Sequence, residues 1–310
     1  MKKKTETAST SGKAFRSGFV AIIGRTNVGK STLVNAITGD KVAIVSPKPQ
    51  TTRHRILGVK NGEGYQIVFV DTPGIHRPAH DFDRMMDKIS KSEAHDADII
   101  VYVADAYMRP DDEDRRACAM LGAGRDEKKS AFLVLNKIDR VKPDRIPDIE
   151  RQYSSLADFK SIFQTCALTG KGLSGLEKAL VKILPEGPQY FPEDMVSDQN
   201  PEMIVAEAVR EKILEQLHQE VPHGIFVLTE ELREGIKEGD LYARVTIYVE
   251  RASHKRIVIG KGGSMLKEIG SAARKELAKR MGNEVFLDLW VKVKEKWKDR
   301  KDLLKSWGYE

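Results

Sequence analysis

The stretch GRTNVGKS, residues 24–31, constrains this chain more than any other feature, because it fits the pattern G-x-x-x-x-G-K-[ST]. An apolar run at residues 19–23 precedes it, and a helical pattern at residues 30–38 follows it. In this setting the glycines let backbone N–H groups converge on a phosphate at the start of a helix. Lys30 can then reach the β- and γ-phosphates, and the Ser31 hydroxyl can bind Mg²⁺. The chain is therefore expected to bind a nucleoside triphosphate.

Apolar runs alternate with amphipathic segments through the first two-thirds of the chain. Strands are expected at residues 19–23, 66–70, 99–104, 131–135 and 161–165, and helices at residues 30–38, 84–94, 111–121 and 145–157. Continuous apolar strands separated by helices predict an α/β domain with a mostly parallel, doubly wound sheet that is covered on both faces.

A proline-rich stretch near residue 185, PEGPQYFPEDMVSDQNPE, has no hydrophobic period and is typical of a linker. Beyond it the pattern predicts a smaller α+β domain, with a helix at 201–219, strands at 225–232 and 241–249, a helix at 264–281 and a strand at 285–293. The expected domains are residues 15–185 and 201–310, joined by a linker over 186–200. Residues 1–14 are basic but have no apolar segment after them, so a disordered tail is expected there rather than a secretory signal.

The charge is concentrated in the last part of the chain. Residues 251–310 hold 16 Lys/Arg and eight Asp/Glu, whereas the whole chain has a net charge of +6. Such a concentration favours a polyanionic partner such as nucleic acid. The two cysteines, Cys118 and Cys166, have neither metal-ligand spacing nor a disulfide framework. No apolar run approaches the roughly 18 residues that a membrane span needs.

Two further motifs follow apolar strands and specify the nucleotide. Asp71-Thr-Pro-Gly74 can hold Mg²⁺ through water with its carboxylate and sense the γ-phosphate with the Gly74 N–H. In Asn136-Lys137-Ile-Asp139, the Asp139 carboxylate can accept two hydrogen bonds from the edge of guanine, a donor pair that adenine lacks. Asn136 and Lys137 would tie this loop down and cover the base.

In this order the three motifs resemble those of the translation-factor-related GTPases. Cys166-Ala167-Leu168 resembles their S-A-[LK] base loop, in which the Ala167 N–H would contact guanine O6. The stretch PQTTR, residues 49–53, resembles their first switch segment, in which Thr52 would close on Mg²⁺ and the γ-phosphate.

The resemblance also bears on hydrolysis. Ras-like proteins orient the attacking water with a glutamine after D-x-x-G, and here that position is Ile75, as in a subgroup with a hydrophobic residue there. Asn27 matches the asparagine that ligates K⁺ in some members of this subgroup. K⁺ is therefore a candidate activator that supplies positive charge near the phosphates. The alternative is that Asn27 only caps the loop.

The resemblance implies a defined set of functional residues. Catalysis would involve Lys30, Asn27, Thr52 and Gly74, and Mg²⁺ would be held by Ser31, Thr52 and, through water, Asp71. GTP or GDP would be bound by Gly24, Asn27, Val28, Gly29, Lys30, Ser31, Thr32, Asp71, Gly74, Asn136, Lys137, Asp139, Cys166, Ala167 and Leu168.

A second glycine loop, Gly260-Lys-Gly-Gly263, is too short to be another phosphate loop of the first kind. It resembles the G-x-x-G loop of KH domains, which clamps the backbone of single-stranded nucleic acid. The β-branched residues 256–259 favour a strand, but the resemblance implies a short helix there, in a type II KH domain. The implied RNA-binding residues are Ile257, Ile259, Gly260, Lys261, Gly262, Gly263 and Lys267.

The order of the two modules resembles a family of bacterial ribosome-assembly GTPases. That resemblance implies a cytoplasmic, monomeric switch that binds the 3′ end of 16S ribosomal RNA, assists 30S assembly and links it to growth and division. A peripheral contact with the inner membrane is a candidate property. Two departures stand out: Thr26 replaces a proline of the phosphate loop, and Cys166 replaces a serine.

Two other classes of protein stay open at this point. One is a nucleotide-using metabolic enzyme such as a kinase, against which the Asn136–Asp139 motif argues. The other is an RNA-binding assembly factor in which the nucleotide has only a structural role.

Overall fold

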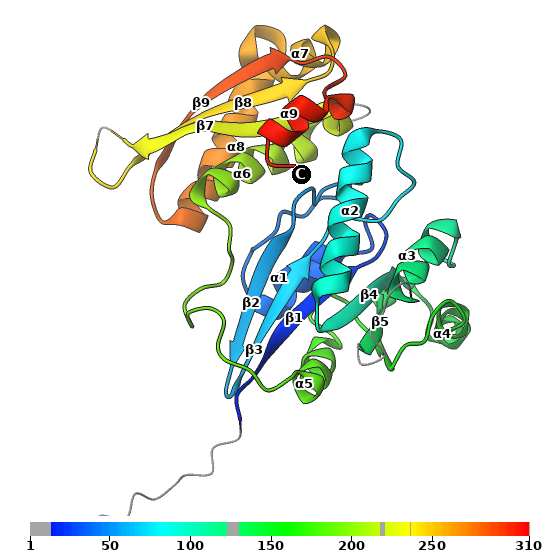
Figure 1. Cartoon of the computed structure of the whole chain (residues 1–310). Coiled ribbons are helices and arrows are strands. Elements are labelled where there is room, and N and C mark those ends of the chain that lie inside the picture. The colour runs from blue at the N-terminus through cyan, green and yellow to red at the C-terminus, as the bar shows by residue number, and fades with distance from the viewer. Residues whose placement is uncertain (1–13, 123–129, 218–220, 236, 310) are drawn as a thin grey trace, which may run out of the picture.

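The chain forms two units, each a sheet with helices packed against it, in a computed structural model that describes residues 14–122, 130–217, 221–235 and 237–309. The units lie end to end, and the segment that joins them runs along one side of the first unit (Figure 1). The tail expected at residues 1–14 falls, except for Ala14, outside these ranges. Among the helices of the described ranges, none is both long and apolar enough to cross a membrane.

The first unit contains the six-stranded sheet. Its strands are β1 (Arg16–Ile23), β2 (Ile56–Gly62), β3 (Tyr65–Asp71), β4 (Ile99–Asp105), β5 (Ser130–Asn136) and β6 (Ser161–Gln164), in the order β2-β3-β1-β4-β5-β6. Only β2 runs antiparallel to its neighbour, β3; the other pairings are parallel. The predicted doubly wound, mostly parallel sheet is confirmed, and β2 is an edge strand that the sequence patterns did not indicate.

Helices cover both faces of this sheet. On one face α1 (Lys30–Thr38) and α5 (Leu173–Ile183) share a core with the strands, and on the other α2 (Asp81–Asp96), α3 (Asp112–Gly122) and α4 (Ile146–Ser154) do so. Because the sheet is sandwiched, β4 is buried at every residue, which explains its continuous apolar sequence. The helix α5 was not among the expected elements.

The parallel strands also determine where the sequence motifs meet. The phosphate loop follows β1, Asp71 ends β3 and Asn136 ends β5. Since β1, β3, β4 and β5 are parallel, their carboxyl ends lie at one edge of the sheet. Ligands of open α/β sheets bind at this edge, so the fold brings the three motifs together.

The proline-rich segment at residues 186–200 is held against the first unit by hydrogen bonds. The Gly187 N–H donates to Phe15 O, and the Val59 N–H of β2 donates to Val196 O at 3.0 Å. The Leu57 N–H donates to the Asp198 carboxylate at 3.0 Å. This linker therefore follows the β2 edge of the sheet.

The second unit has the α-β-β-α-α-β order that the resemblance implies. Its elements are α6 (Pro201–Gln216), β7 (Ile225–Glu234), β8 (Leu241–Val249), α7 (Ala252–Ile259), α8 (Ser264–Met281) and β9 (Val285–Val293), followed by α9 (Lys301–Ser306). Strand β8 pairs antiparallel with β7 and parallel with β9. Residues 256–259 belong to a helix, so the strand that their β-branched composition favours is wrong. Val258 is buried in the core there, and the preference for a strand is overridden by packing.

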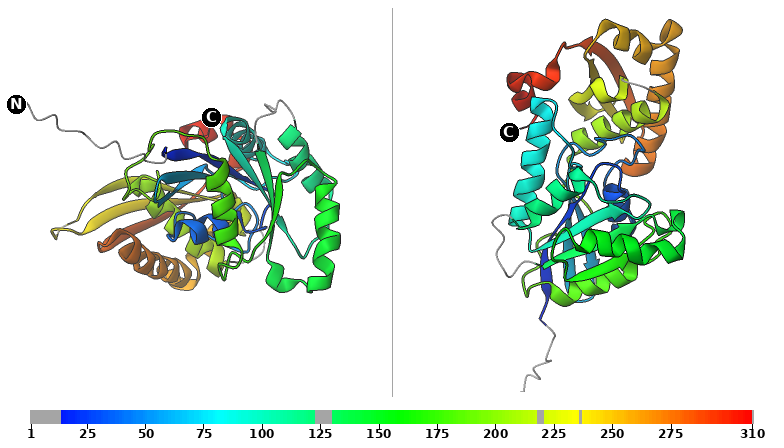
Figure 2. Two further views of the ribbon diagram at one scale, coloured as in Figure 1. Left: turned by 90° about the horizontal axis from the view of Figure 1, so that it is seen from below. Right: turned by 90° about the vertical axis from the view of Figure 1, so that its right-hand side faces the viewer.

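Aromatic side chains join the two units. Phe82 of α2 lies 5.1 Å from the Trp297 ring and 4.9 Å from the Tyr309 ring, measured between ring centroids. The Trp297 indole N–H donates to Gly224 O at 3.1 Å, which satisfies its only polar group. Two views show α2 reaching from the first unit to the C-terminal segment around α9 (Figure 1, Figure 2).

We predict that Trp297→Ala destabilises the protein by about 3–5 kcal/mol, because the fully buried ring leaves a cavity and an unpaired Gly224 carbonyl. Urea unfolding followed by circular dichroism measures this. Trp290 on β9 is 55% exposed and serves as a matched control; Trp290→Ala is expected to cost less than about 1 kcal/mol. An equal loss of unfolding free energy in the two variants would show that Trp297 contributes no more to stability than an exposed tryptophan.

Candidate nucleotide site and second glycine loop

The phosphate loop has a backbone that glycine alone accommodates at two positions. Gly24 has φ 151°, and an added Cβ would lie 2.2 Å from Val103 O. Gly29 has φ 100°, and an added Cβ would lie 2.4 Å from the Asn136 side-chain nitrogen. The loop is therefore packed directly onto β4 and onto the base-binding motif, with no space for a side chain between them.

Lys30 begins α1 beneath this loop. Its ammonium donates to Gly24 O at 3.2 Å and to Arg25 O at 2.8 Å, and the residue is buried. Burial lowers the pKa of Lys30 to about 8, while the nearby Asp71 carboxylate opposes this. Both acceptors are neutral carbonyls of the loop itself, so the charge remains available for phosphate oxygens.

Three oxygen-bearing side chains from separate motifs converge beside Lys30. The Ser31 hydroxyl donates to Asp71 Oδ2 at 2.6 Å, the Thr52 hydroxyl reaches the same oxygen at 3.2 Å, and the two hydroxyls are 2.8 Å apart. Asp71 has no exposed surface, and burial raises the pKa of its carboxyl group. Its Oδ1 has no hydrogen-bond partner among the described residues. Two hydroxyl oxygens beside a buried carboxylate with one free oxygen fit Mg²⁺.

The base-binding motif is tied to the phosphate loop through Asn136. Its amide donates to Val28 O at 3.0 Å and accepts from the Ala167 N–H at 3.0 Å. Lys137 donates to Asn27 O at 2.5 Å and to Asp105 at 2.8 Å. In this structure Asn136 and Lys137 therefore tie the base-binding loop to the phosphate loop.

Asp139 and Leu168 are exposed where this motif faces solvent. The Asp139 carboxylate has no hydrogen bond or ion pair within the described part of the chain, so both of its oxygens can accept from a ligand. Leu168 is 80% exposed, and an exposed leucine beside an acceptor pair is suited to cover a flat ring.

A cavity of about 500 Å³ connects these groups. Of the residues expected at the nucleotide, Gly24, Val28 and Asp71 do not line it and are buried. The sequence patterns missed residues 44–47, Gln50 and Arg140, which also lie on its wall. Residues 44–47 lie just before the first switch segment, and that position was the available signal. The expected residues that line the cavity are Asn27, Gly29, Lys30, Ser31, Thr32, Thr52, Gly74, Asn136, Lys137, Asp139, Cys166, Ala167 and Leu168.

Ile75 does not point into the cavity. It is buried in the core of the α2 face, and its N–H donates to Gly24 O at 3.1 Å. Its neighbour Gly74 lies so close to Thr26 that an added Cβ would be 2.7 Å from Thr26 Cα. The side chain at position 75 therefore serves packing, and water must be positioned by other groups.

Asn27 is exposed at the tip of the phosphate loop with φ 62°. Its amide donates to Pro47 O at 2.7 Å, so it links the loop to the segment that precedes Thr52. The Asn27 backbone carbonyl accepts from Lys137, while its side-chain oxygen accepts no hydrogen bond from a described residue and so is open to a monovalent cation.

The second glycine loop joins α7 to α8 through three glycines with positive φ: Gly260 at 74°, Gly262 at 58° and Gly263 at 84°. Lys261 is exposed on this loop, and Lys267 is exposed one turn into α8. Ile257 is 49% exposed on the preceding helix, and Ile259 is half-buried. The expected RNA-binding residues thus lie on α7, the glycine loop and the first turn of α8, and they combine glycine backbone, positive charge and apolar side chains.

Comparisons with known proteins match both units. A family described as 50S ribosome-binding GTPase matches residues 19–137, and a KH domain family matches residues 220–298. GTPase Era of Alkaliphilus metalliredigens is 44% identical over 297 residues, which covers 96% of this chain and all of that protein. GTPase Era of Caldanaerobacter subterraneus subsp. tengcongensis is 45% identical over 298 residues, 96% of this chain and 98% of that protein.

Two solved structures match almost the whole chain. Era in complex with MgGDPNP and nucleotides 1506–1542 of 16S ribosomal RNA has a TM-score of 0.90 at 38% identity, and covers 95% of this chain and 99% of its own. A single-residue variant of Aquifex aeolicus Era bound to GDP·AlF₄⁻ has a TM-score of 0.89 at 38% identity with the same coverage.

We predict that Gly29→Ala lowers guanine-nucleotide affinity at least about tenfold, because its Cβ would displace the Asn136 side chain that joins the phosphate and base motifs. Gly39→Ala, at the other end of α1, is the matched control: its φ is 84°, but nothing lies within 4 Å of an added Cβ. Both variants should lose about 1 kcal/mol of stability from the positive φ. Titration with a fluorescent nucleotide measures the affinity, and unchanged binding in Gly29→Ala would contradict the prediction.

Proposed function

The chain belongs to the Era family of GTPases, and from this we propose that it is a GTP-hydrolysing switch that binds the 3′ end of 16S ribosomal RNA and assists 30S subunit assembly. The observation that carries the proposal is the presence, in one chain, of the Ser31–Thr52–Asp71 cluster and the exposed Gly260–Gly263 loop. The solved relative in complex with MgGDPNP and the 16S fragment matches across both units, which supports a shared arrangement.

The nucleotide would be bound by groups that already face the cavity. The phosphate-loop N–H groups and Lys30 would hold its phosphates, and Asp139 would select guanine. The Ala167 N–H, which was expected to contact guanine O6, already donates to Asn136 at 3.0 Å in this structure. Ser31, Thr52 and Asp71 would hold Mg²⁺, which neutralises developing charge on the phosphates when bound. An adenine-specific kinase is disfavoured, because Asp139 would then face a ring without the matching donor pair.

Hydrolysis requires positive charge near the phosphates and an ordered water, and the apolar Ile75 side chain supplies neither. We propose that K⁺ bound near Asn27 supplies the charge, because the Asn27 amide already contacts the Pro47 carbonyl of the switch segment. Thr52 and the Gly74 N–H would then orient the γ-phosphate and the water.

If K⁺ acts in this way, turnover in K⁺ buffer should exceed turnover in Na⁺ buffer of the same ionic strength by roughly tenfold or more. Asn27→Ala should remove most of that difference. Phosphate release under multiple turnover gives the rates. Equal turnover in the two buffers would show that Asn27 only links the loop to the switch segment.

RNA would be held at the second glycine loop, where small residues allow a sugar-phosphate backbone to approach closely. Lys261 and Lys267 would neutralise phosphates, while Ile257 and Ile259 would contact bases. Both lysines belong to residues 251–310, the part of the chain with the excess of positive charge, which favours binding of a polyanion.

The variant Gly262→Asp tests this site, because it adds a negative charge to the loop without a clash. Affinity for an oligonucleotide of the 16S 3′ end should fall at least about tenfold at fixed salt, while GTP turnover is unchanged. Gly282→Asp is the matched control, since Gly282 has φ 75°, open space around it and a place at the far end of α8. Equal RNA affinity of the two variants would argue against the loop.

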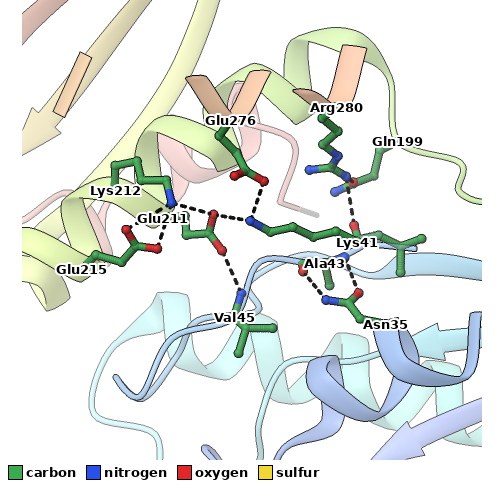
Figure 3. A network of polar contacts seen from close by, with 11 residues as sticks. Asn35, Lys41, Ala43, Val45, Gln199, Glu211, Lys212, Glu215, Glu276 and Arg280 are labelled. Carbon is green, nitrogen blue, oxygen red and sulfur yellow. Dashed lines mark hydrogen bonds and ion pairs between the residues drawn. The ribbon is translucent and has the colours of Figure 1, made fainter. Parts of the chain in front are cut away.

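The structure suggests a direct route between nucleotide and RNA. Lys41, in the segment that leads to Thr52, pairs with Glu211 of α6 at 2.7 Å and with Glu276 of α8 at 2.6 Å (Figure 3). The Val45 N–H donates to Glu211 at 3.3 Å, and Arg280 of α8 donates to Val42 O at 3.2 Å. Because α8 begins at the second glycine loop, a movement of residues 41–45 that shifts α8 would also shift the RNA site.

We predict that a GTP analogue raises RNA affinity relative to GDP, and that Lys41→Ala brings the ratio of the two affinities toward one. Lys178→Ala on α5, an exposed lysine of the first unit, should leave the ratio unchanged. Fluorescence anisotropy at one fixed salt concentration measures both affinities. If the wild type shows the same RNA affinity with both nucleotides, this coupling does not operate.

We further propose that the protein acts as a monomer in the cytoplasm. A peripheral contact with the inner membrane would use the basic run at residues 292–305. A link to growth and division would follow from the control of 30S supply by the nucleotide state.

A further inference from the structure

A second cavity, of about 310 Å³, lies between the two units. Its wall combines Arg53, the last residue of the switch segment, and His54 with residues of α6, β7 and the C-terminal segment. The polar side chains that matter for its chemistry are Arg53, His54, Glu207, Arg210 and Tyr309.

Two arginines of this wall are buried, and only one carboxylate pairs with them. Glu207 contacts the Arg210 guanidinium at 2.7 and 2.6 Å. Arg53 has no carboxylate within ion-pair distance in the described ranges; it donates to Gln50 O and Ile225 O and lies against the Phe82 and Trp297 rings. Burial and the neighbouring Arg210 lower the pKa of Arg53 to about 10, so it remains charged at neutral pH. The cavity wall therefore has an uncompensated positive charge, which is costly when buried.

Two donors of the wall are also without partners. Arg210 Nη1 and the Tyr309 hydroxyl are buried and make no hydrogen bond to any described residue. Burial raises the pKa of Tyr309, so the hydroxyl keeps its proton. The Tyr309 ring stacks on His54 at 4.3 Å, and burial lowers the pKa of His54 to about 4, which leaves that imidazole neutral. Buried donors without acceptors are uncommon in folded proteins.

Neighbouring carboxylates are already engaged elsewhere. Asp83 accepts from the Ala79 and His80 N–H groups and pairs with His76. Glu211 pairs with Lys41 and Lys212. Glu202 is exposed at the rim and forms no ion pair with either arginine. Among the described residues, no carboxylate is therefore left to pair with Arg53.

We infer that this cavity binds a small-molecule oxyanion, a phosphoryl or carboxylate group, through Arg53, Arg210 Nη1 and the Tyr309 hydroxyl. Planar guanidinium groups and a hydroxyl donor match the oxygens of such a group. The volume admits inorganic phosphate or a small phosphorylated or carboxylated metabolite.

Such a ligand would bridge the two units next to the switch segment. Arg53 directly follows Thr52, and Arg210 donates to Thr51 O. Binding of the anion would favour this arrangement of the units, and by linkage its affinity would depend on the nucleotide state. This dependence rests on the proposed function, whereas the binding itself does not.

The test uses the full-length protein with Mg²⁺ and a saturating non-hydrolysable GTP analogue, so that the phosphate loop is occupied. Its Tm is measured against inorganic phosphate and against acetate, at constant ionic strength with chloride. The wild type should show a saturable rise in Tm with at least one of the two anions, which also distinguishes the phosphoryl from the carboxylate source.

Tyr309→Phe removes only the unpartnered hydroxyl, so its Tm without anion should equal or exceed that of the wild type, while its anion affinity falls at least about tenfold. Arg53→Met should abolish the response. Tyr190→Phe, at a tyrosine of the linker that is 45% exposed, is the matched control and should respond like the wild type.

Two results would overturn the inference: no anion-dependent rise in the wild type, or a full wild-type response in both Tyr309→Phe and Arg53→Met. GTP turnover and RNA affinity are measured without anion in the same preparations. Failure of the anion site leaves those wild-type activities in place, whereas failure of the proposed function removes them whatever the anion does.

Discussion

The carboxylate of Asp71 is the constraint around which the first unit is organised. It ends a central strand with no exposed surface, and an isolated buried carboxylate is unfavourable. Its compensation comes from two places in the sequence: the Lys30 charge and the Ser31 hydroxyl of the phosphate loop, and the Thr52 hydroxyl of the switch segment. The cluster therefore links the phosphate loop to the switch segment even before a ligand contributes. A cation that joins the cluster would bind the remaining oxygen of Asp71. Because the cation would also contact the phosphates, it would connect their presence to the cluster.

The elements whose signals are local were predictable from the sequence. The helix at Ser264–Met281 and the strand at Val285–Val293 have the expected bounds, because glycines flank the helix and apolar residues alternate along the strand. Residues 256–259 show where local preference fails, since the composition favours a strand while packing of Val258 selects a helix. The family resemblance resolved that conflict, and physical patterns alone did not.

Contacts between distant segments could not be predicted. The sequence around Lys41 is typical of an exposed lysine. Nothing in it indicates that Glu211 and Glu276 will lie within 3 Å of the Lys41 ammonium. The same holds for Arg53 and Arg210, whose burial depends on how the two units meet. Strand β2 was missed because an edge strand that ends in polar residues has a weak pattern. The motifs thus locate the nucleotide site, and the tertiary fold alone shows what surrounds it.

The linker's course along β2 has a consequence for solubility. An open sheet presents unpaired N–H and C=O groups at its edge strand, where another chain can add and begin aggregation. Here Val196 and Asp198 accept the N–H groups of Val59 and Leu57, so part of that edge is occupied from within the chain. A segment whose sequence shows only prolines and charges therefore also acts as a cover against intermolecular strand pairing.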